Sequence, residues 1–341
     1  MTLLIRADAN TRMGTGHLMR CLALAQGWQA QGGQAIFITA CESDELLRRL
    51  SDEGFTTIIL EKPHPDLADW RTTSQVLTAY PGAWVVLDGY HFDPLYQRQV
   101  KEAGHPLLVI DDMAHLDHYY ADVVLNQNIN AAQLDYACEP DTRLLLGTRY
   151  TLLRREFWPW RGWKRETPDV AHKVLVTLGG GDPDNQTLKV VRALQKVDVD
   201  GLEATVVVGA SNPHFREIES AARGLPATRL VRDVSNMAEL MARADVAVTA
   251  GGSTCWEIAF LGLPSVLLVL ADNQKGIAKG LNEAGAALKL GWYKEVTSKQ
   301  IAGALSHLVS SHKQRQLMSH NGQSLVDGIG GERIVSTIVE G

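Results

Sequence analysis

The chain has 341 residues, 45% of them apolar, with a formal net charge of −6 and an isoelectric point near 6.0. This length allows two domains of ordinary size, and the apolar content is sufficient for a packed core. No basic tail and no run of Lys or Arg occurs, which argues against nucleic acid as the main partner.

The apolar segments are short, and LPSVLLVLA over residues 263–271 is among the longest. None could cross a bilayer as a helix. The first ten residues, MTLLIRADAN, lack the charged start and long apolar centre of a signal peptide. Four scattered cysteines contain no C-x-x-C pair, which argues against a disulfide framework or a zinc site. We expect a cytoplasmic protein without membrane insertion, and no pattern indicates its oligomeric state.

Short apolar runs alternate with amphipathic stretches from the N-terminus onward. The runs that predict strands are LLIRAD, QAIFITA, TTIIL, AWVVLDGY, PLLVIDD and ADVVLNQ. HLMRCLALAQGWQAQG predicts a helix whose apolar stripe comprises Leu18, Cys21, Leu22, Ala25 and Trp28. SDELLRRLSDEG predicts a second helix with Ser43 as its N-cap. Because each strand is a near-continuous apolar run, we expect a parallel sheet that is buried on both faces.

The segment RREFWPWRGWKRETPD has no clean period, and we interpret residues 151–170 as a linker between domains 1–150 and 171–341. The alternation then restarts. Expected strands are HKVLVTL, LEATVVVG, TRLVRD, DVAVTA and PSVLLVLA; expected helices are NQTLKVVRALQKV, PHFREIESAARG, NMAELMARA and CWEIAFLG. The fold class predicted is α/β, with two Rossmann-like, doubly wound parallel-sheet domains facing across a cleft. The last helix is a candidate for packing back on the N-terminal domain.

Ligands of open parallel sheets bind beyond the carboxyl ends of the strands, so the loops there are the places to search. In TAGGSTCWE, two glycines turn the chain into a helix, and we expect the N–H groups of Gly252, Ser253 and Thr254 to hold a phosphate. Glu257, one turn later, could bind the ribose hydroxyls of a nucleotide. The alternatives are a plain N-capped turn and a capping box between Thr254 and Glu257.

Two other glycine-rich loops give weaker signals. In LGGGD, Gly180 could contact the ligand, or the glycines could only allow close approach of domains. MGTGH, with Gly14 and Gly16, lacks the spacing of a dinucleotide fingerprint, and no G-K-[ST] of a P-loop occurs. A dehydrogenase and a P-loop NTPase are therefore not expected, and we expect no cofactor.

His17 stands out among eleven histidines because it follows the Gly14-x-Gly16 turn at the start of a helix. The positive end of a helix dipole disfavours imidazolium, and neutral imidazole can act as a general base. The alternative is that His17 only caps the helix. Asp88, Asp111 and Asp112 follow strands and could orient the base or contact substrate, or could simply shape their loops.

Neutral polar groups suited to a sugar occur in two further loops. Tyr90 could close over a sugar or be an ordinary half-buried aromatic residue. Asn273 and Gln274 in LADNQ could bind hydroxyls or amides, with an N-cap as the alternative for Asn273. The D-x-D segments 182–184 and 198–200 are too short to indicate a metal, and helix N–H donors make one unnecessary at a diphosphate. No metal is expected.

Five motifs occur in order: GTGHLMRCLALA, IDDMAHLDHYYADVVLNQN, LGGGDPDN, AGGSTCWEIAFLGLP and LADNQ. Over nearly the whole chain this set resembles the UDP-2,4-diacetamido-2,4,6-trideoxy-β-L-altropyranose hydrolases of bacterial pseudaminic acid biosynthesis. That family belongs to the GT-B superfamily and is similar to the peptidoglycan N-acetylglucosaminyltransferase. The resemblance implies metal-independent removal of UDP by water, with inversion at the anomeric carbon.

The resemblance also implies roles for particular residues. The catalytic histidine of the family falls on His17, and a catalytic asparagine falls on Asn273. The uracil-binding stretch falls on residues 232–235, which include Arg232, Asp233 and Val234. The chain departs from the family at Gly89, where a larger residue is expected before the tyrosine.

Two other functions remain open at this point. A GT-B glycosyltransferase would use the same UDP-amino-sugar donor with a sugar or lipid acceptor. A non-catalytic subunit would bind the nucleotide sugar and need a partner chain for activity. In each case the expected ligand is a small UDP-sugar.

Overall fold

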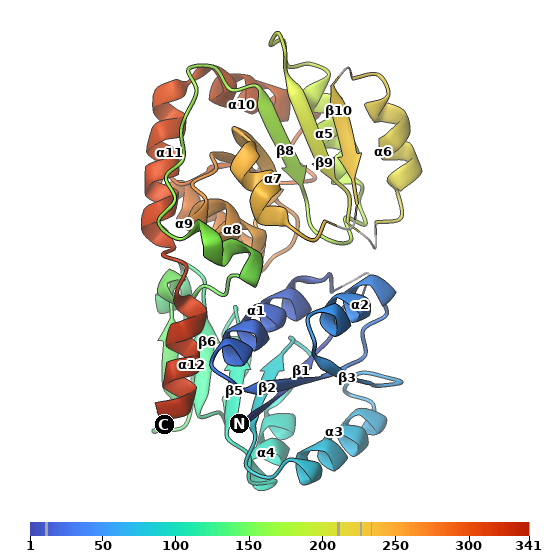
Figure 1. Ribbon diagram of the computed structural model, residues 1–341, viewed down its shortest axis with the longest axis vertical. Coiled ribbons are helices and arrows are strands. Elements are labelled where there is room, and N and C mark those ends of the chain that lie inside the picture. Colours follow the sequence, from blue (N-terminus) through green and yellow to red (C-terminus); the bar gives the residue numbers. More distant parts are fainter. Residues whose placement is uncertain (11–12, 210–211, 226, 233, 341) are drawn as a thin grey trace. The chain divides into compact units, whose positions relative to one another are not determined.

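The computed structural model describes residues 1–340 except 11–12, 210–211, 226 and 233. The chain divides into two compact units, each with its own parallel sheet (Figure 1). Unit 1 comprises Met1–Arg155 and Ile329–Gly341, and unit 2 comprises Glu156–Gly328. The predicted α/β class with two doubly wound sheets is confirmed.

Unit 1 contains a seven-stranded sheet in the order β3-β2-β1-β4-β5-β6-β7, with every pair parallel. Its strands are β1 (Thr2–Ala7), β2 (Gln34–Thr39), β3 (Thr56–Ile59), β4 (Trp84–Asp88), β5 (Leu107–Ile110), β6 (Val123–Asn126) and β7 (Arg143–Leu146). The strand order reverses between β1 and β4, and such a switch point is where open sheets bind ligands.

The main helices of unit 1 are α1 (Gly16–Ala30), α2 (Asp44–Asp52), α3 (Leu67–Ala79), α4 (Pro94–Glu102) and α12 (Gly330–Glu340). The predicted apolar stripe of α1 is buried, and so is most of the rest of the helix, because α12 packs against it. Ser43 caps α2 as predicted, since its hydroxyl accepts a hydrogen bond from Leu46 N.

Unit 2 repeats the plan with six parallel strands in the order β10-β9-β8-β11-β12-β13. The strands are β8 (Lys173–Thr177), β9 (Glu203–Val207), β10 (Thr228–Val231), β11 (Val246–Ala250), β12 (Ser265–Val269) and β13 (Leu288–Trp292). The helices are α5 (Gln186–Leu194), α6 (Phe215–Ala222), α7 (Met237–Arg243), α8 (Thr254–Phe260), α9 (Gln274–Glu283), α10 (Ser298–Ser310) and α11 (His312–Leu325). Its switch point lies between β8 and β11.

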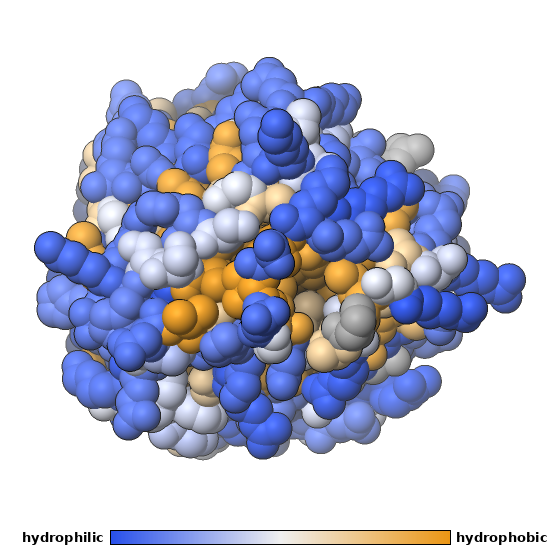
Figure 2. Space-filling view, turned by 90° about the horizontal axis from the view of Figure 1, so that it is seen from above, coloured by the Kyte–Doolittle hydropathy of each residue, from blue (hydrophilic) through white to orange (hydrophobic). Residues whose placement is uncertain are grey.

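Each unit buries its own apolar residues around its sheet. Figure 2 shows a face on which hydrophilic side chains predominate and hydrophobic ones gather near the middle. Within the described ranges, no helix has both the length and the apolar composition to span a membrane.

Candidate active site

The glycine turn MGTGH, residues 13–17, lies between β1 and α1 at the switch point of unit 1. Gly14 has φ +78°, in the left-handed region that favours glycine, and its N–H donates to Asn10 O at 2.8 Å. Gly16 is the first residue of α1. The turn therefore brings His17 into the first turn of a helix beside the end of β4.

His17 pairs with Asp88, the last residue of β4. Its Nδ1 lies 2.6 Å from Asp88 Oδ1, and both side chains are buried. An ionised carboxylate only accepts hydrogen bonds, so Nδ1 carries the proton and Nε2 keeps its lone pair. Among the described residues, Nε2 makes no hydrogen bond. The residue before α1 is Thr15, so His17 does not cap the helix.

Arg20, one turn along α1, binds the same carboxylate with two nitrogens. Its Nε lies 2.6 Å from Asp88 Oδ2 and its Nη2 lies 2.6 Å from Asp88 Oδ1. The fork fixes the plane of the carboxylate and hence the direction of the bond to His17. Arg20 was not among the residues predicted from the sequence. The signal was an arginine within an apolar helical run, three residues after the candidate base.

The network continues from Arg20 to Asp112 and Tyr90. Arg20 Nη1 donates to Asp112 Oδ2 at 2.6 Å, and the Tyr90 hydroxyl donates to the same oxygen at 3.0 Å. Asn128 Nδ2 donates to Asp112 Oδ1 at 2.8 Å. The Tyr90 ring meets the His17 ring edge-on, with the centroids 5.0 Å apart. We call His17, Arg20, Asp88, Tyr90 and Asp112 the His17 centre.

Asp111, the other carboxylate of the IDD segment, lies outside this centre. Its Oδ1 accepts from Met113 N and Ala114 N, both at 2.7 Å, and its Oδ2 lies 2.5 Å from His115 Nδ1. It therefore shapes its own loop. His115 Nε2 lies 3.2 Å from Tyr90 O, which links that loop to the backbone of the His17 centre.

Asp88 and Arg20 in the His17 centre stabilise each other's charged forms. Burial alone would raise the pKa of the Asp88 carboxyl, but Arg20 and His17 lower it well below its usual range. Burial alone would lower the pKa of the Arg20 guanidinium, but the neighbouring Asp112 and Asp88 raise this pKa well above its usual value. Asp88 is therefore an anion at neutral pH, as an acceptor for His17 Nδ1–H must be.

Unit 2 places Gly252 next to Gln274 at the turn from β11 into α8. A methyl group at Gly252 would lie 3.9 Å from Gln274 Nε2, and one at Gly251 would lie 3.1 Å from Gln274 Cβ. Gln274 Oε1 accepts from Leu270 N at 2.9 Å, which fixes the amide. The turn between β11 and α8 and the start of α9 thus meet at the carboxyl edge of the sheet.

Helix capping is the alternative role for the polar residues of this turn. Ser253 is the N-cap of α8 and Thr254 is its first residue, so Thr254 does not form the capping box with Glu257. Neither Ser253 nor Asn273, the N-cap of α9, makes a side-chain cap hydrogen bond. Capping therefore does not account for Asn273 or for the serine.

The LGGGD loop has a clear structural role. A methyl group at Gly209 would lie 2.2 Å from Gly180 O, so the loops after β8 and β9 touch through their backbones. In the following D-P-D segment, Asp182 accepts from Gln186 N and Thr187 N, both at 2.7 Å. Asp184 accepts from the Tyr293 hydroxyl at 2.7 Å. Both carboxylates thus have structural partners.

The segment expected to bind uracil connects β10 to α7. The Arg232 guanidinium lies over the Phe215 ring, 4.8 Å from its centroid, and Val234 is partly buried. Asp233 lies outside the described residues. Across the residues the structure describes, no three His, Cys, Asp or Glu side chains are placed to hold a metal ion.

Comparison with known proteins finds one matching family model and several relatives. Residues 174–329 match the model of the glycosyltransferase family 28 C-terminal domain. The chain is 25% identical over 336 residues to the spore coat polysaccharide biosynthesis protein SpsG of Bacillus subtilis, covering 98% of this chain and 96% of that protein.

It is also 23% identical over 295 residues to the UDP-2,4-diacetamido-2,4,6-trideoxy-beta-L-altropyranose hydrolase of Campylobacter jejuni, covering 84% and 97% of the two chains. The crystal structure of Acinetobacter baumannii MurG superposes with a TM-score of 0.69 at 18% identity and covers 100% of this chain and 99% of that one. The fold is therefore of the GT-B type.

Proposed function

We propose that this chain is a nucleotide-sugar enzyme that uses water as its acceptor and releases UDP from a UDP-activated, N-acetylated amino sugar. The specific substrate proposed is the compound in the name of the Campylobacter relative, UDP-2,4-diacetamido-2,4,6-trideoxy-β-L-altropyranose. The observation that carries the proposal is the buried pair of His17 and Asp88, 2.6 Å apart, at the switch point of unit 1.

In the proposed reaction, His17 Nε2 takes a proton from water as the water oxygen bonds to the anomeric carbon. The bond from that carbon to the diphosphate oxygen breaks, and its electron pair leaves with UDP. Attack from the face opposite the leaving group inverts the anomeric carbon. The imidazolium formed is stabilised by Asp88, which Arg20 holds in place. A positioned base of this kind contributes about 10²–10⁴-fold.

Unit 2 is proposed to bind the nucleotide, and the match to the family 28 C-terminal domain supports this assignment. The backbone N–H groups of Gly252, Ser253 and Thr254 would bind the diphosphate. Glu257 would bind the ribose, and Arg232 and Val234 would bind uracil. Asn273 and Gln274 would bind the sugar, and Gly180 would contact the ligand from the loop after β8.

A glycosyltransferase is the second candidate, because the matched domain model is that of a glycosyltransferase family. Such an enzyme would use the same base to deprotonate a sugar or lipid hydroxyl instead of water. The two candidates differ only in the acceptor, so the geometry of the base alone does not separate them.

The test is incubation of the full chain with UDP-2,4-diacetamido sugars, with and without carbohydrate acceptors, followed by proton NMR. Hydrolysis predicts free sugar, initially as the inverted anomer, at full rate without acceptor. Turnover only when an acceptor is added would establish the transferase. Tight UDP binding by calorimetry without turnover of any donor would contradict both and favour a non-catalytic binding subunit.

A further inference from the structure

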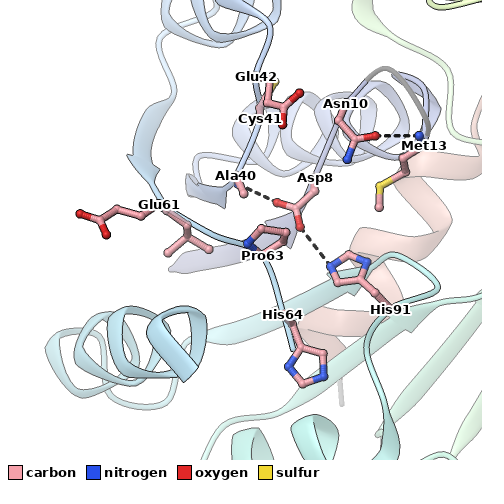
Figure 3. A pocket seen from close by; sticks show the side chains of 11 residues that line it. Asp8, Asn10, Met13, Ala40, Cys41, Glu42, Glu61, Pro63, His64 and His91 are labelled. Carbon is pink, nitrogen blue, oxygen red and sulfur yellow. Dashed lines mark hydrogen bonds and ion pairs between the residues drawn. The ribbon is translucent and has the colours of Figure 1, made fainter. Parts of the chain in front are cut away.

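The loop after β4 is held from two sides within unit 1. On one side, His91 Nε2 lies 3.0 Å from Asp8 Oδ2, and Figure 3 shows this pair. A methyl group at Gly89 would lie 2.6 Å from His91 Cε1, so the glycine leaves the space that the ring occupies. On the other side, Tyr90 contacts both the His17 centre and the loop after β5. Tyr90 is therefore the residue through which these two loops meet beside the candidate base.

Tyr90 is fixed by contacts at its ring, its hydroxyl and its carbonyl. The ring meets two imidazoles edge-on, with its centroid 5.0 Å from that of His17 and 5.6 Å from that of His115. The hydroxyl donates to Asp112 Oδ2 at 3.0 Å. The carbonyl oxygen lies 3.2 Å from His115 Nε2. A change in the contact with His115 would therefore alter how Tyr90 packs against His17.

Both partners of the His115 ring nitrogens are groups that only accept hydrogen bonds. Nδ1 lies 2.5 Å from Asp111 Oδ2, and Nε2 lies 3.2 Å from Tyr90 O. Burial alone would raise the pKa of the Asp111 carboxyl, but His115 and the Met113 N–H lower it, so Asp111 is an anion at neutral pH. A carboxylate and a carbonyl oxygen have no proton to donate, so both ring nitrogens must carry one. The geometry is that of an imidazolium.

The backbone before His115 is strained and is held by the same carboxylate. Ala114 has φ +50°, in the left-handed region that is unfavourable for a residue with a Cβ atom. Asp111 Oδ1 accepts from Met113 N and Ala114 N, both at 2.7 Å. Such strain persists only where surrounding contacts maintain it. Asp111 therefore fixes the backbone with one oxygen and the His115 ring with the other.

The charges around His115 favour its protonated form. The hydrogen bond to Asp111 raises the pKa of His115, against the opposing effect of burial. Within the described part of the chain, the groups in contact with the ring are the Asp111 carboxylate and Tyr90. Tyr119 lies near Asp111, and burial raises the pKa of its hydroxyl, so it stays neutral and adds no charge.

A rise in pH would break one of the two hydrogen bonds of His115. Because its pKa is raised by folding, the interactions of the imidazolium are complete at low pH and are lost as the pH rises through that value. A neutral imidazole donates from one nitrogen only. The carboxylate of Asp111 is a stronger acceptor than the carbonyl of Tyr90, so the bond to Tyr90 is the one that is lost.

We propose that His115 is a positioning residue for the reaction at His17. As an imidazolium it holds Tyr90 against the base, and its deprotonation releases Tyr90 and lowers turnover at alkaline pH. This inference rests on the proposed function. It gives His115 no contact with the substrate, because both of its N–H groups are already used.

The kinetic test compares the pH profiles of wild type, His115→Gln and His115→Arg, with His118→Gln as the matched control in the same loop. In wild type and control, kcat should fall about tenfold at alkaline pH, since displacement of a positioned group slows a reaction without weakening ligand binding. His115→Gln cannot become charged, so it should be about tenfold slower already at pH 6.5 and lack the alkaline fall. His115→Arg keeps its charge and should stay active at alkaline pH. Inhibition by UDP should stay within about twofold in every variant.

A kinetic result of the opposite kind would remove His115 from the reaction. If His115→Gln kept both the wild-type rate at pH 6.5 and the alkaline fall, the positioning role would be overturned. Loss of activity at alkaline pH in His115→Arg, with the same midpoint as in wild type, would also overturn it, because the fall would then belong to another group.

Histidine NMR without substrate separates the positioning role from the reaction. In wild type, His115 should be mostly imidazolium at pH 6.5, where an ordinary histidine is half protonated, and its titration should shift the Tyr90 ring signals. Asp111→Asn should lower the pKa of His115, and its Oδ1 can still accept from Met113 N and Ala114 N, so the loop should fold.

The NMR outcomes distinguish the two levels of the proposal. A His115 that is mostly neutral at pH 6.5, or Tyr90 signals that do not follow its titration, would overturn the positioning role even in an active enzyme. Coupled titration of His115 and Tyr90 in a wild-type protein that turns over no UDP-sugar would instead reject the proposed function, and it would leave His115 as the residue that fixes Tyr90 beside His17.

Discussion

The two units share one strand order around their switch points and differ in what they place there. In unit 1, β4 ends on Asp88 and β1 is followed directly by Asp8, and each of these carboxylates pairs with a buried arginine. In unit 2, β8 and β11 run into glycine turns. Ion pairs within the described part of unit 2 lie on its surface.

This difference shows that one topology can present two kinds of binding chemistry. Unit 1 fixes charged side chains, whose positions depend on buried ion pairs, and is suited to move a proton. Unit 2 is proposed to hold an anion with backbone N–H groups, whose positions depend on glycine turns and helix starts. Changes to the first should affect the reaction and unit 1's stability, and changes to the second should affect nucleotide affinity.

The largest effect is expected at the base. His17→Leu should lower the hydrolysis rate by about 10²–10⁴-fold, because water then loses its proton acceptor. UDP affinity, measured by calorimetry, should stay within twofold of wild type. His118→Leu, at a half-exposed histidine paired with Glu139, is the matched control and should keep full activity. Near-normal kinetics in His17→Leu would remove the base from the proposal.

The next effect concerns the stability of unit 1. Arg20→Met leaves Asp88 and Asp112 without their shared cation and should lower the free energy of unfolding by about 3–5 kcal/mol. Hydrogen exchange on the full chain should show the loss in peptides of unit 1 and much less in unit 2. Arg71→Met, at an exposed position on α3, should change neither unit. Equal loss of protection in both units would show that the network does not act locally.

A milder effect is expected at the glycine turn of unit 2. Gly252→Ala meets no atom closer than 3.9 Å in the protein, so the unit should fold normally. The added methyl should obstruct the approach of a phosphate and weaken UDP binding about tenfold, as measured by calorimetry. Gly303→Ala, where a methyl meets nothing within 4 Å, should bind UDP as wild type does. Unchanged affinity in Gly252→Ala would place the diphosphate elsewhere.

Acid should destabilise unit 1 before unit 2. Arg20 and His17 lower the pKa of Asp88 against the effect of burial, and His91 and Arg6 do the same for Asp8. A carboxyl whose pKa is lowered by folding stabilises the protein above its ordinary pKa, and this contribution is lost as the pH falls through the folded value. Hydrogen exchange at decreasing pH should therefore show unit 1 opening first, below about pH 4. Simultaneous opening of both units would contradict the contrast between them.

Removal of metal ions is expected to have no effect on turnover. Asp182 and Asp184 each have structural hydrogen bonds, and a diphosphate held by helix N–H groups needs no cation. EDTA should therefore leave turnover unchanged. Activity that is lost in EDTA and restored by Mn²⁺ would show that a metal takes part.

The architecture could be predicted from the amino-acid pattern, because burial of parallel strands on both faces requires near-continuous apolar runs. All eleven strands expected from such runs are present. The two strands it missed, β7 and β13, lie at sheet edges, are partly exposed and include a charged residue, so their pattern is weaker. The glycine turns and His17 could also be found in this way, since their local chemistry is unusual wherever it occurs.

Which charged groups pair with one another could not be predicted before the fold was known. Arg20 lies 68 positions from Asp88 in the chain and Arg6 lies 63 from Asp69, and no local pattern encodes such pairs. Choosing Asp88 as the partner of His17, and directing Asp111 into its own loop, depended on strand register and side-chain direction. Gly89 had no explanation until the His91 ring was found in the space that a side chain would occupy. Apolar burial is averaged over many residues and can therefore be predicted from composition and period, whereas an ion pair depends on a few ångströms between distant segments.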